Sequence, residues 1–322
     1  MGNLLDSPNT AKVSEPFTSS TGLTAGSSGM QGWRLEMEDA HIACDMPSLP
    51  HHTFVAIFDG HGGAGAAHYA AANLITYIEE TGQWEQYLKS GANDPELLGE
   101  ALSQAFLDLD AELRVRQSTD KFDSSGCTSV TAMITPNHIV CANAGDSRCV
   151  LGTNKTTRAM SDDHKPTDDR ERRRIEAAGG SVQWKRVDGD LAVSRAFGDF
   201  QYKTRSDLGP KEQKVTCFPD ITIHERTAKD EVLLLACDGL WDVMSSDEAV
   251  VTIREMFNDG YSNMVLVAEE MLEIALHKGS KDNISAVVVL LPGAVIALRE
   301  NSKHSIPPNG SESGVSFDRV GK

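Results

Sequence analysis

Short apolar runs alternate along the chain with longer amphipathic stretches, and each kind predicts one type of element. Runs rich in Val, Ile, Leu and Thr between turn residues predict strands at Thr53–Phe58, Thr128–Thr135, His138–Ala144, Cys149–Gly152, Glu231–Cys237 and Ile284–Leu291. Apolar residues at helical spacing predict helices at Ala64–Glu80, Pro95–Gln117, Asp168–Ala178, Asp247–Phe257 and Met264–Lys278. Hairpin strands with paired antiparallel helices between them favour an α+β layered sandwich over a doubly wound sheet.

The two ends of the chain differ from this body in composition. Residues 1–21 are rich in Ser, Thr and Pro and predict a flexible segment. Residues 293–322 carry Asn, Ser, Gly and Pro with little periodicity, which is typical of a disordered tail. The sequence therefore predicts one domain over residues 22–292 between two tails.

Charge and cysteine content narrow the classes of function. The net charge of −17 disfavours nucleic acid as a partner, because phosphate binding needs clustered cations. The charge is compatible with the binding of multivalent cations, and the alternative interpretation is that it only keeps the protein soluble. The six cysteines form no C-x-x-C pair and several lie in apolar runs, so we expect reduced, buried thiols and a cytoplasmic or nuclear protein. No apolar run approaches the roughly 20 residues that span a membrane.

Aspartates stand at one end of four predicted strands. Asp59 and Asp238 each follow a strand and precede Gly, Asp146 lies at a hairpin turn, and Asp282 precedes the last strand. Any one of them is ordinary turn chemistry. If the four strand ends converge, however, the carboxylates repel one another unless a divalent cation, which prefers oxygen ligands, lies between them.

The segment from Gly32 to His41 adds further charged side chains. In an extended conformation Arg34, Glu36 and Glu38 lie on one face, so Glu38 reaches a metal ion while Arg34 reaches a phosphate bound to it. A solvated, charged strand edge is the alternative interpretation.

The stretch from Gly60 to Gly65 matches the dinucleotide-binding pattern G-x-G-x-x-G. We reject that function because residues 81–94 are polar and lead to another helix, so the βαβ unit is missing, and because Asp59 stands where pyrophosphate would approach. The glycines instead allow close approach of the backbone to a metal ion or phosphate. No cysteine-nucleophile phosphate loop or Gly-Lys-Ser/Thr loop is present in the sequence.

Six ordered motifs resemble those of the type 2C (PPM) metal-dependent protein serine/threonine phosphatases. They are Gly32–His41, Phe58–Gly63, Ala142–Arg148, Gly189–Asp199, Leu235–Asp242 and Gly279–Asn283. The resemblance covers about residues 22–292 and implies a four-layer α-β-β-α sandwich, whose central antiparallel β-sandwich is flanked by pairs of helices. It also implies a metal cluster in a cleft at one end and a flap at about residues 152–213.

The resemblance further implies a role for each motif residue. Two tightly bound Mg²⁺ or Mn²⁺ ions are expected, one on Asp59, Asp238 and Asp282, the other on Asp59, the Gly60 carbonyl and, through water, Glu38. A weaker third site would use Asp146, Asp238 and Asp242, with Asp39 in the second shell. Arg34 would bind the phosphate, and His61 would be the general acid unless it is a metal-ligand or turn histidine. Lys165 and Arg186 would lie near the substrate, or are simply solvated.

These assignments predict hydrolysis of phosphoserine and phosphothreonine in signalling proteins, by direct attack of a hydroxide that bridges the two metal ions. A pseudophosphatase that binds without metals and a metal-dependent phosphodiesterase are the rival functions. We expect a monomer with phosphoprotein substrates. The start Met-Gly-Asn-Leu-Leu-Asp exposes Gly2 for myristoylation and weak membrane association, although Asp6 replaces the usual Ser or Thr.

Overall fold

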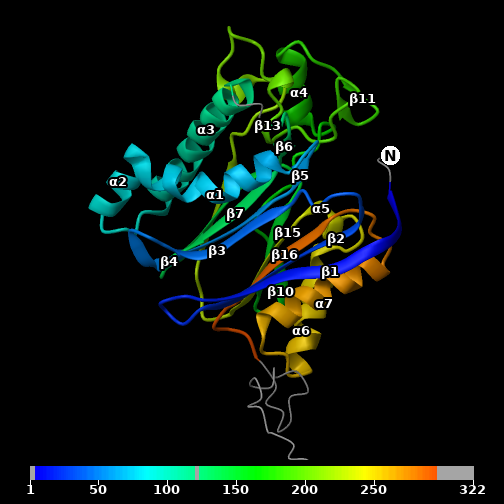
Figure 1. The fold of residues 1–322 in the computed structure, drawn as a ribbon. Helices are drawn as coiled ribbons and strands as arrows, with labels where there is room; N and C mark the ends of the chain where they lie inside the picture. The colour runs from blue at the N-terminus through cyan, green and yellow to red at the C-terminus, as the bar shows by residue number, and fades with distance from the viewer. Residues whose placement is uncertain (1–3, 120–122, 296–322) are drawn as a thin grey trace, which may run out of the picture.

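Two antiparallel sheets lie face to face with helices on both outer sides, and this gives four layers (Figure 1). The computed structural model describes residues 4–119 and 123–295. The six-stranded sheet has the order β1 (Leu4–Thr18), β2 (Thr24–Arg34), β16 (Ile284–Leu290), β15 (Asp230–Ala236), β9 (Arg148–Thr153) and β10 (Thr156–Ala159). The five-stranded sheet has the order β14 (Asp220–Glu225), β8 (His138–Ala144), β7 (Ser129–Ile134), β4 (Leu49–Phe58) and β3 (Ala40–Met46). The predicted α+β sandwich is confirmed.

Helices cover the outer face of each sheet. The five-stranded sheet packs against α1 (Gly65–Glu80) and α3 (Pro95–Thr119), with α2 (Gly82–Lys89) between them in the chain. The six-stranded sheet packs against α6 (Ser246–Asn258) and α7 (Met264–His277). Three helices in a row after β5 also exclude the βαβ unit of a dinucleotide-binding fold, as expected from the sequence.

The alternation of side chains along the central strands explains the layers. In β4, Phe54 and Phe58 pack under the helices, whereas Val55 and Ile57 face the opposite sheet. Successive side chains of β15 divide in the same way between the α6–α7 side and the space between the sheets. Strands that are buried on both faces have continuous apolar sequences, which is why the central strands β4 and β15 were predicted correctly.

The N-terminal segment corrects the sequence analysis. We expected residues 1–21 to be flexible, but Leu4–Thr18 forms the edge strand β1, antiparallel to β2. Pro8 and Pro16 fit there because an edge strand tolerates a missing N–H. Ser14 Oγ donates to Glu269 Oε1 at 2.7 Å on α7, so the segment is held by contacts distant in sequence.

Strand β2 was missed because its composition is unusual for a strand. It contains Gly26 and Gly29, and an added Cβ at Gly26 would lie 2.2 Å from the backbone carbon of Met264. The small residues let α7 approach the sheet closely, which is one of the reasons for glycine inside a strand.

The expected flap is a compact unit with its own small core. Ile175, Val187, Ala196 and Val215 pack together in it. Its elements are α4 (Asp169–Ala177), β11 (Val182–Gln183), β12 (Arg186–Val187), β13 (Phe197–Gly198), η1 (Phe200–Tyr202) and η2 (Pro210–Glu212). The predicted start at residue 152 is too early, because residues up to Ala159 still belong to the six-stranded sheet through β9 and β10.

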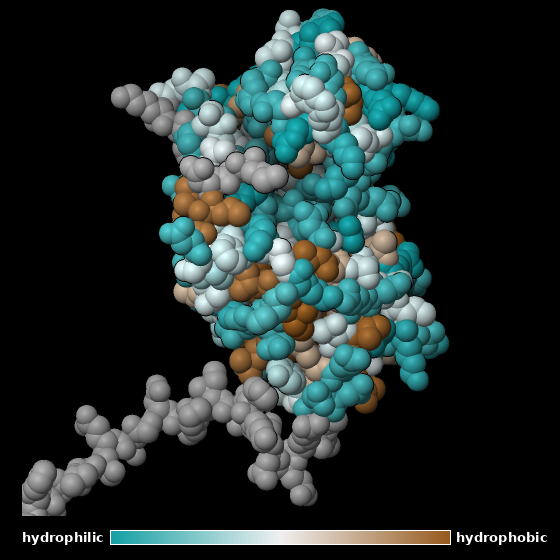
Figure 2. All heavy atoms as spheres, turned by 90° about the vertical axis from the view of Figure 1, so that its right-hand side faces the viewer, coloured by the Kyte–Doolittle hydropathy of each residue, from teal (hydrophilic) through white to brown (hydrophobic). Residues whose placement is uncertain are grey.

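None of the helices within residues 4–119 and 123–295 is long and apolar enough to cross a membrane. The face seen in Figure 2 is mainly hydrophilic, with apolar residues in small scattered groups. The predicted C-terminal tail lies, from residue 296 onward, outside the described residues, as does Gly2.

Candidate metal centre and catalytic cleft

The register of the six-stranded sheet brings two of the predicted aspartates, Asp146 and Asp238, to the same end of the sheet. Ala236 of β15 lies opposite Arg148 of β9 on one side and Ala286 of β16 on the other. Asp238, two residues after Ala236, therefore lies at the same end of the sheet as Asp146, two residues before Arg148. Antiparallel neighbours place the end of one strand beside the start of the next.

The five-stranded sheet contributes Asp59 at the end of β4. The backbone oxygen of Asp59 accepts a hydrogen bond from Thr128 N at 2.9 Å, and Gly60 then enters the short strand β5 (Gly60–His61), which pairs with β6 (Gly126–Cys127). Glu38 lies against this turn, because its Oε1 accepts a hydrogen bond from Gly63 N at 2.6 Å. The Asp59 turn and Glu38 thus lie together.

Asn283 joins the Glu38 segment to the start of β16. Its Oδ1 accepts from Glu38 N at 2.9 Å, and its Nδ2 donates to the carbonyls of Gln31 and Glu36 at 2.8 and 2.9 Å. These bonds fix the chain around Glu38 next to Asp282. The sequence analysis gave Asn283 no role, although it stands in the last of the six motifs.

The electrostatics show that the predicted carboxylates form one cluster. Burial raises the pKa of Asp59 well above its usual range, and repulsion from Asp238, Asp39, Asp146 and Asp282 raises it further. Burial also raises the pKa of Asp238 well above its usual range, with added repulsion from Asp146 and Asp282. A divalent cation among these oxygens would remove that repulsion.

Two buried carboxylate oxygens in the cluster lack a hydrogen-bond partner among the described residues. They are Oδ1 of Asp146 and Oδ1 of Asp39. Leaving a buried polar atom unsatisfied is costly, so such atoms call for a ligand. All the acidic donors are hard oxygens, which Mg²⁺ and Mn²⁺ prefer. The residues present therefore fit a divalent-cation centre.

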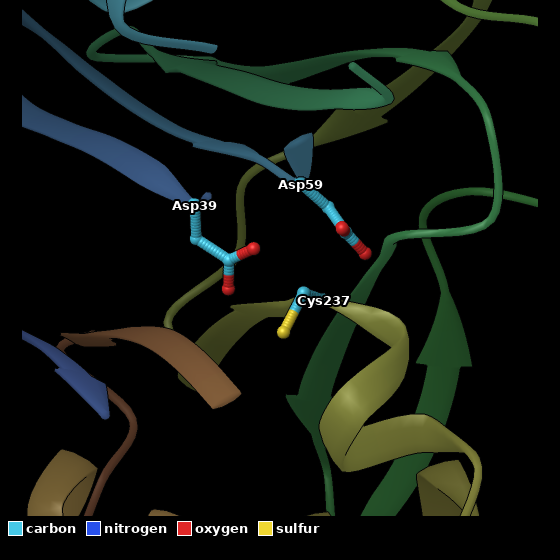
Figure 3. A group of neighbouring side chains, drawn as sticks. All are labelled: Asp39, Asp59 and Cys237. Atoms are coloured by element: carbon cyan, nitrogen blue, oxygen red, sulfur yellow. The ribbon is translucent and has the colours of Figure 1, made fainter. Parts of the chain in front are cut away.

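The side chains of Asp39, Asp59 and Cys237 lie close to one another (Figure 3). Ligand atoms of these three residues lie within 4.8 Å of one another. Burial keeps the pKa of the Cys237 thiol well above its usual range, and its sulfur accepts from Ser285 N at 3.1 Å, so it is a poor ligand for a hard cation. Asp39 accepts from Ser285 Oγ at 2.7 Å, and burial raises the pKa of Asp39 to about 6.

The predicted cationic residues are divided between the cluster and the flap. Arg34 forms an ion pair with Asp282, and Lys165 forms one with Asp146, so both cations lie at the carboxylates. Arg186 is exposed on β12 and donates to the carbonyl of Asp190 within the flap.

Asp242 follows the short helix α5 (Asp238–Trp241), and its side chain is exposed. Although Asp242 reaches solvent, partial desolvation by the surrounding chain raises its pKa, the Lys165 charge lowers it and repulsion from Asp146 raises it, with a net upward shift. Asp242 therefore lies within electrostatic reach of Asp146 and Lys165.

His61 contacts a residue that the sequence analysis did not single out. His61 Nε2 and Asp199 Oδ2 are 2.7 Å apart, and the Asp199 side chain is only 4% exposed. Burial alone lowers the pKa of His61, but Asp199, with smaller effects of Asp146 and Glu38, raises it above its usual value. Asp199 adopts a left-handed conformation with φ of 54°, which is uncommon for a residue other than Gly and draws attention to it.

Fold and site together define a class of antiparallel β-sandwich proteins with helices on both outer faces. They carry an acidic cluster that fits divalent cations and, near it, a histidine–aspartate pair. Residues 23–284 match the family model described as Protein phosphatase 2C. The chain belongs to the protein phosphatase 2C family.

Several known proteins resemble the chain over most of its length. Human Protein phosphatase 1A is 39% identical over 298 residues, which cover 91% of this chain and 77% of that protein. Human Protein phosphatase 1B is 40% identical over 304 residues, again 91% of this chain but only 62% of that longer protein.

Solved structures show the same fold. Serine-threonine phosphatase 2C from Toxoplasma gondii superposes with a TM-score of 0.74 at 26% identity, over 87% of this chain and 99% of that one. A C. elegans sex determining protein superposes with a TM-score of 0.71 at 26% identity, over 86% of this chain and 66% of that one.

Proposed function

We propose that this chain is a protein serine/threonine phosphatase that requires Mg²⁺ or Mn²⁺ and hydrolyses phosphoserine and phosphothreonine monoesters. The observation that carries the proposal is the set of buried, mutually repelling carboxylates around Asp59 and Asp238, with an unsatisfied oxygen on Asp146. Membership of the family and the identity to two human protein phosphatases support it.

The carboxylates divide into three sets in this proposal. Asp59, Asp238 and Asp282 would hold one cation. Asp59, the Gly60 carbonyl and Glu38, through water, would hold the second. Asp146, Asp238 and Asp242 would hold a weaker third, and Asp39 would support the cluster from beside Asp59 without binding a cation directly. When bound, the cations supply Lewis acidity and lower the pKa of water so that a nucleophile is available near neutral pH.

The chain's own side chains position the ester and protonate the leaving group. Arg34 is half-buried at the cluster, where its guanidinium neutralises oxygens of the phosphate; in the structure it pairs with Asp282. His61 supplies the proton that a serine alkoxide needs in order to leave. Asp199 accepts from His61 Nε2 and orients the ring, which leaves Nδ1 for a second partner.

A metal titration tests the proposal. Dialysed protein should hydrolyse a phosphoserine peptide only after Mg²⁺ or Mn²⁺ is added, and Asp59→Asn should lose about 10³-fold or more of the turnover because it serves two cations. Asp108→Asn is the matched control, because Asp108 is exposed on α3 far along the chain from the cluster.

Three results would contradict the proposal. Activity that survives a chelator would exclude the metal mechanism. Normal metal binding without turnover on any phosphopeptide would favour a pseudophosphatase. Faster hydrolysis of a phosphodiester than of the phosphopeptide would favour the phosphodiesterase.

Partners and location follow from the same proposal. We infer phosphoprotein substrates, a monomeric enzyme in the cytoplasm or nucleus, and a weak membrane association through a myristoyl group on Gly2. The intact mass of protein from its native host should show that group, and an unmodified or acetylated terminus would exclude it.

A further inference from the structure

Asp146 is a buried carboxylate with one satisfied and one unsatisfied oxygen. The residue is 3% exposed, its Oδ2 is paired with the ammonium of Lys165, and its Oδ1 has no partner within the described part of the chain. A buried charge is strongly destabilising unless it is paired, so the ammonium supplies a counter-charge that this position needs.

The backbone around Lys165 is attached to the turn that carries Asp146. His164 N donates to Gly145 O at 2.9 Å, and Gly145 N donates back to His164 Nδ1 at 3.1 Å. Lys165 N donates to Asp168 Oδ2 at 3.0 Å, and Asp168 N donates to Lys165 O at 3.0 Å. The ammonium is thus delivered to Asp146 from a fixed main chain, and only the side chain is able to swing away.

The Lys165 charge acts on the carboxylates of the proposed third cation site. Asp146, Asp238 and Asp163 attract its ammonium, and the ammonium in turn favours the charged form of Asp242. Asp163 already has a bidentate partner in Arg148, at 2.9 Å for both contacts. The Lys165 ammonium therefore contacts Asp146 directly, and its charge reaches the other two carboxylates of the proposed third site, Asp238 and Asp242, through space.

We propose that Lys165 is the built-in counter-cation of Asp146, and that its ammonium and a third divalent cation exclude each other at this carboxylate. Two cations against one carboxylate repel each other, and this repulsion is offset only where enough carboxylates surround them, as proposed around Asp59. At Asp146 the Lys165 ammonium already takes up the negative charge that a divalent ion would need. Binding of the divalent ion therefore releases the Lys165 side chain toward solvent, where it becomes available to an anionic group in the cleft. The coupling is reciprocal, because each cation weakens the other by the same factor.

The proposal rests on the proposed function for the identity of the cation as Mn²⁺ or Mg²⁺. It gives a physical reason for the weakness expected of the third site: an incoming ion must displace a charge that is already present. The proposal also predicts that removing the charge of Lys165 strengthens cation binding at the third site, although no ligand is added.

Calorimetric titration with Mn²⁺ alone tests the inference on dialysed full-length protein. Lys165→Met keeps the length of the side chain and removes its charge. The dissociation constant of the weakest Mn²⁺ site should fall about tenfold, equivalent to about 1.4 kcal/mol, while the tighter sites stay unchanged. Lys89→Met is the matched control, because Lys89 is exposed at the end of α2 and its loss changes the net charge equally.

Amine labelling provides a second readout that does not depend on the variant. Acetic anhydride followed by peptide mass spectrometry should label Lys165 faster once the weak site is saturated with Mn²⁺, and labelling of Lys89 should not change. In Asp146→Asn, Lys165 should label fast with or without Mn²⁺.

The outcomes separate this inference from the proposed function. If the wild-type chain binds Mn²⁺ but Lys165→Met leaves the weakest site within twofold of its affinity, or weakens it, Lys165 is not a competitor. Mn²⁺-independent labelling of Lys165 in the wild type would also overturn the inference. A wild-type chain that binds no Mn²⁺ at all would refute both this inference and the proposed function.

Discussion

A buried ion pair between Asp110 of α3 and Lys203 joins the flap to the body of the protein. Lys203 Nζ donates to both oxygens of Asp110, at 2.9 and 2.8 Å, and to the carbonyl of Ala196 at 2.9 Å. Gly198 N also donates to Asp110 Oδ1 at 2.8 Å. Only 5% of Lys203 and 8% of Asp110 are exposed. One carboxylate therefore holds the backbone directly before Asp199, the partner of His61.

Replacing Asp110 by Asn removes the charge and keeps the shape of the side chain. Lys203 then remains buried without a counter-charge, and breaking a buried pair from one side costs about 3–5 kcal/mol. That is a large part of the roughly 5–15 kcal/mol by which a typical protein is stable. Asp108→Asn, two residues away on the exposed side of α3, should change the free energy of unfolding by less than about 0.5 kcal/mol.

Urea unfolding followed by circular dichroism measures both variants under the same conditions. The double variant Asp110→Asn/Lys203→Met should recover most of the loss, because it leaves no unpaired charge in the interior. A loss below about 1 kcal/mol for Asp110→Asn, or simple additivity in the double variant, would show that the pair is solvated and that our reasoning about its burial is wrong.

Two further predictions concern the site and the flap. His61→Gln should slow the hydrolysis of phosphoserine peptides by about 10²–10⁴-fold but that of p-nitrophenyl phosphate far less, since an aryl oxygen leaves without a proton. Asp199→Asn should change the two rates in the same direction and should lower the pKa of His61, which proton NMR titration measures. Equal losses on both substrates would refute the acid role of His61. Glu171 is buried, which alone raises its pKa, but Arg195 and Arg174 lower the pKa of Glu171 to about 2 from 4.5. Because the pKa of Glu171 is lower in the folded state, its contribution to stability is complete above about pH 4.5 and is lost as the pH falls toward 2. Glu171→Gln should therefore make the free energy of unfolding less dependent on pH in that range. An unchanged slope of the free energy of unfolding against pH would contradict this prediction.

The fold was predictable where the local sequence decides the structure. His138–Ala144 was predicted residue for residue as β8, and the helices over α1, α3, α6 and α7 were predicted to within three residues at each end. Polar or small-residue strands were missed. Edge strand β1 depends on contacts with β2 and α7, and neither contact leaves a periodic pattern in its own sequence. Helix α2 was missed because its start depends on Thr81, whose side chain accepts from Trp84 N, in a stretch that reads as polar.

The carboxylate cluster was predictable for a related reason. Asp59 and Asp238 directly follow strands whose ends are visible in the sequence. The two strands belong to different sheets, and the packing of these sheets against each other brings the two ends together. Asn283 and Asp199 were not assigned roles, because their partners lie far away in the chain and their side chains act on backbone or on another side chain. Tertiary contacts of that kind have no local sequence signal, apart from the motifs in which both residues stand.

The contact between His61 and Asp199 shows why some site contacts cannot be predicted from the sequence. His61 lies on β5, Asp199 follows β13, and β6 pairs with both of these strands and carries Gly126 between them. A Cβ at Gly126 would lie 2.4 Å from Asp199 Oδ2 and 2.5 Å from His61 Nε2, so only glycine leaves room for the two side chains to meet. A histidine 138 residues from its carboxylate thus depends on a third residue that has no side chain at all. The catalytic assignment of His61 therefore rests on backbone geometry as much as on the motif that first drew attention to it.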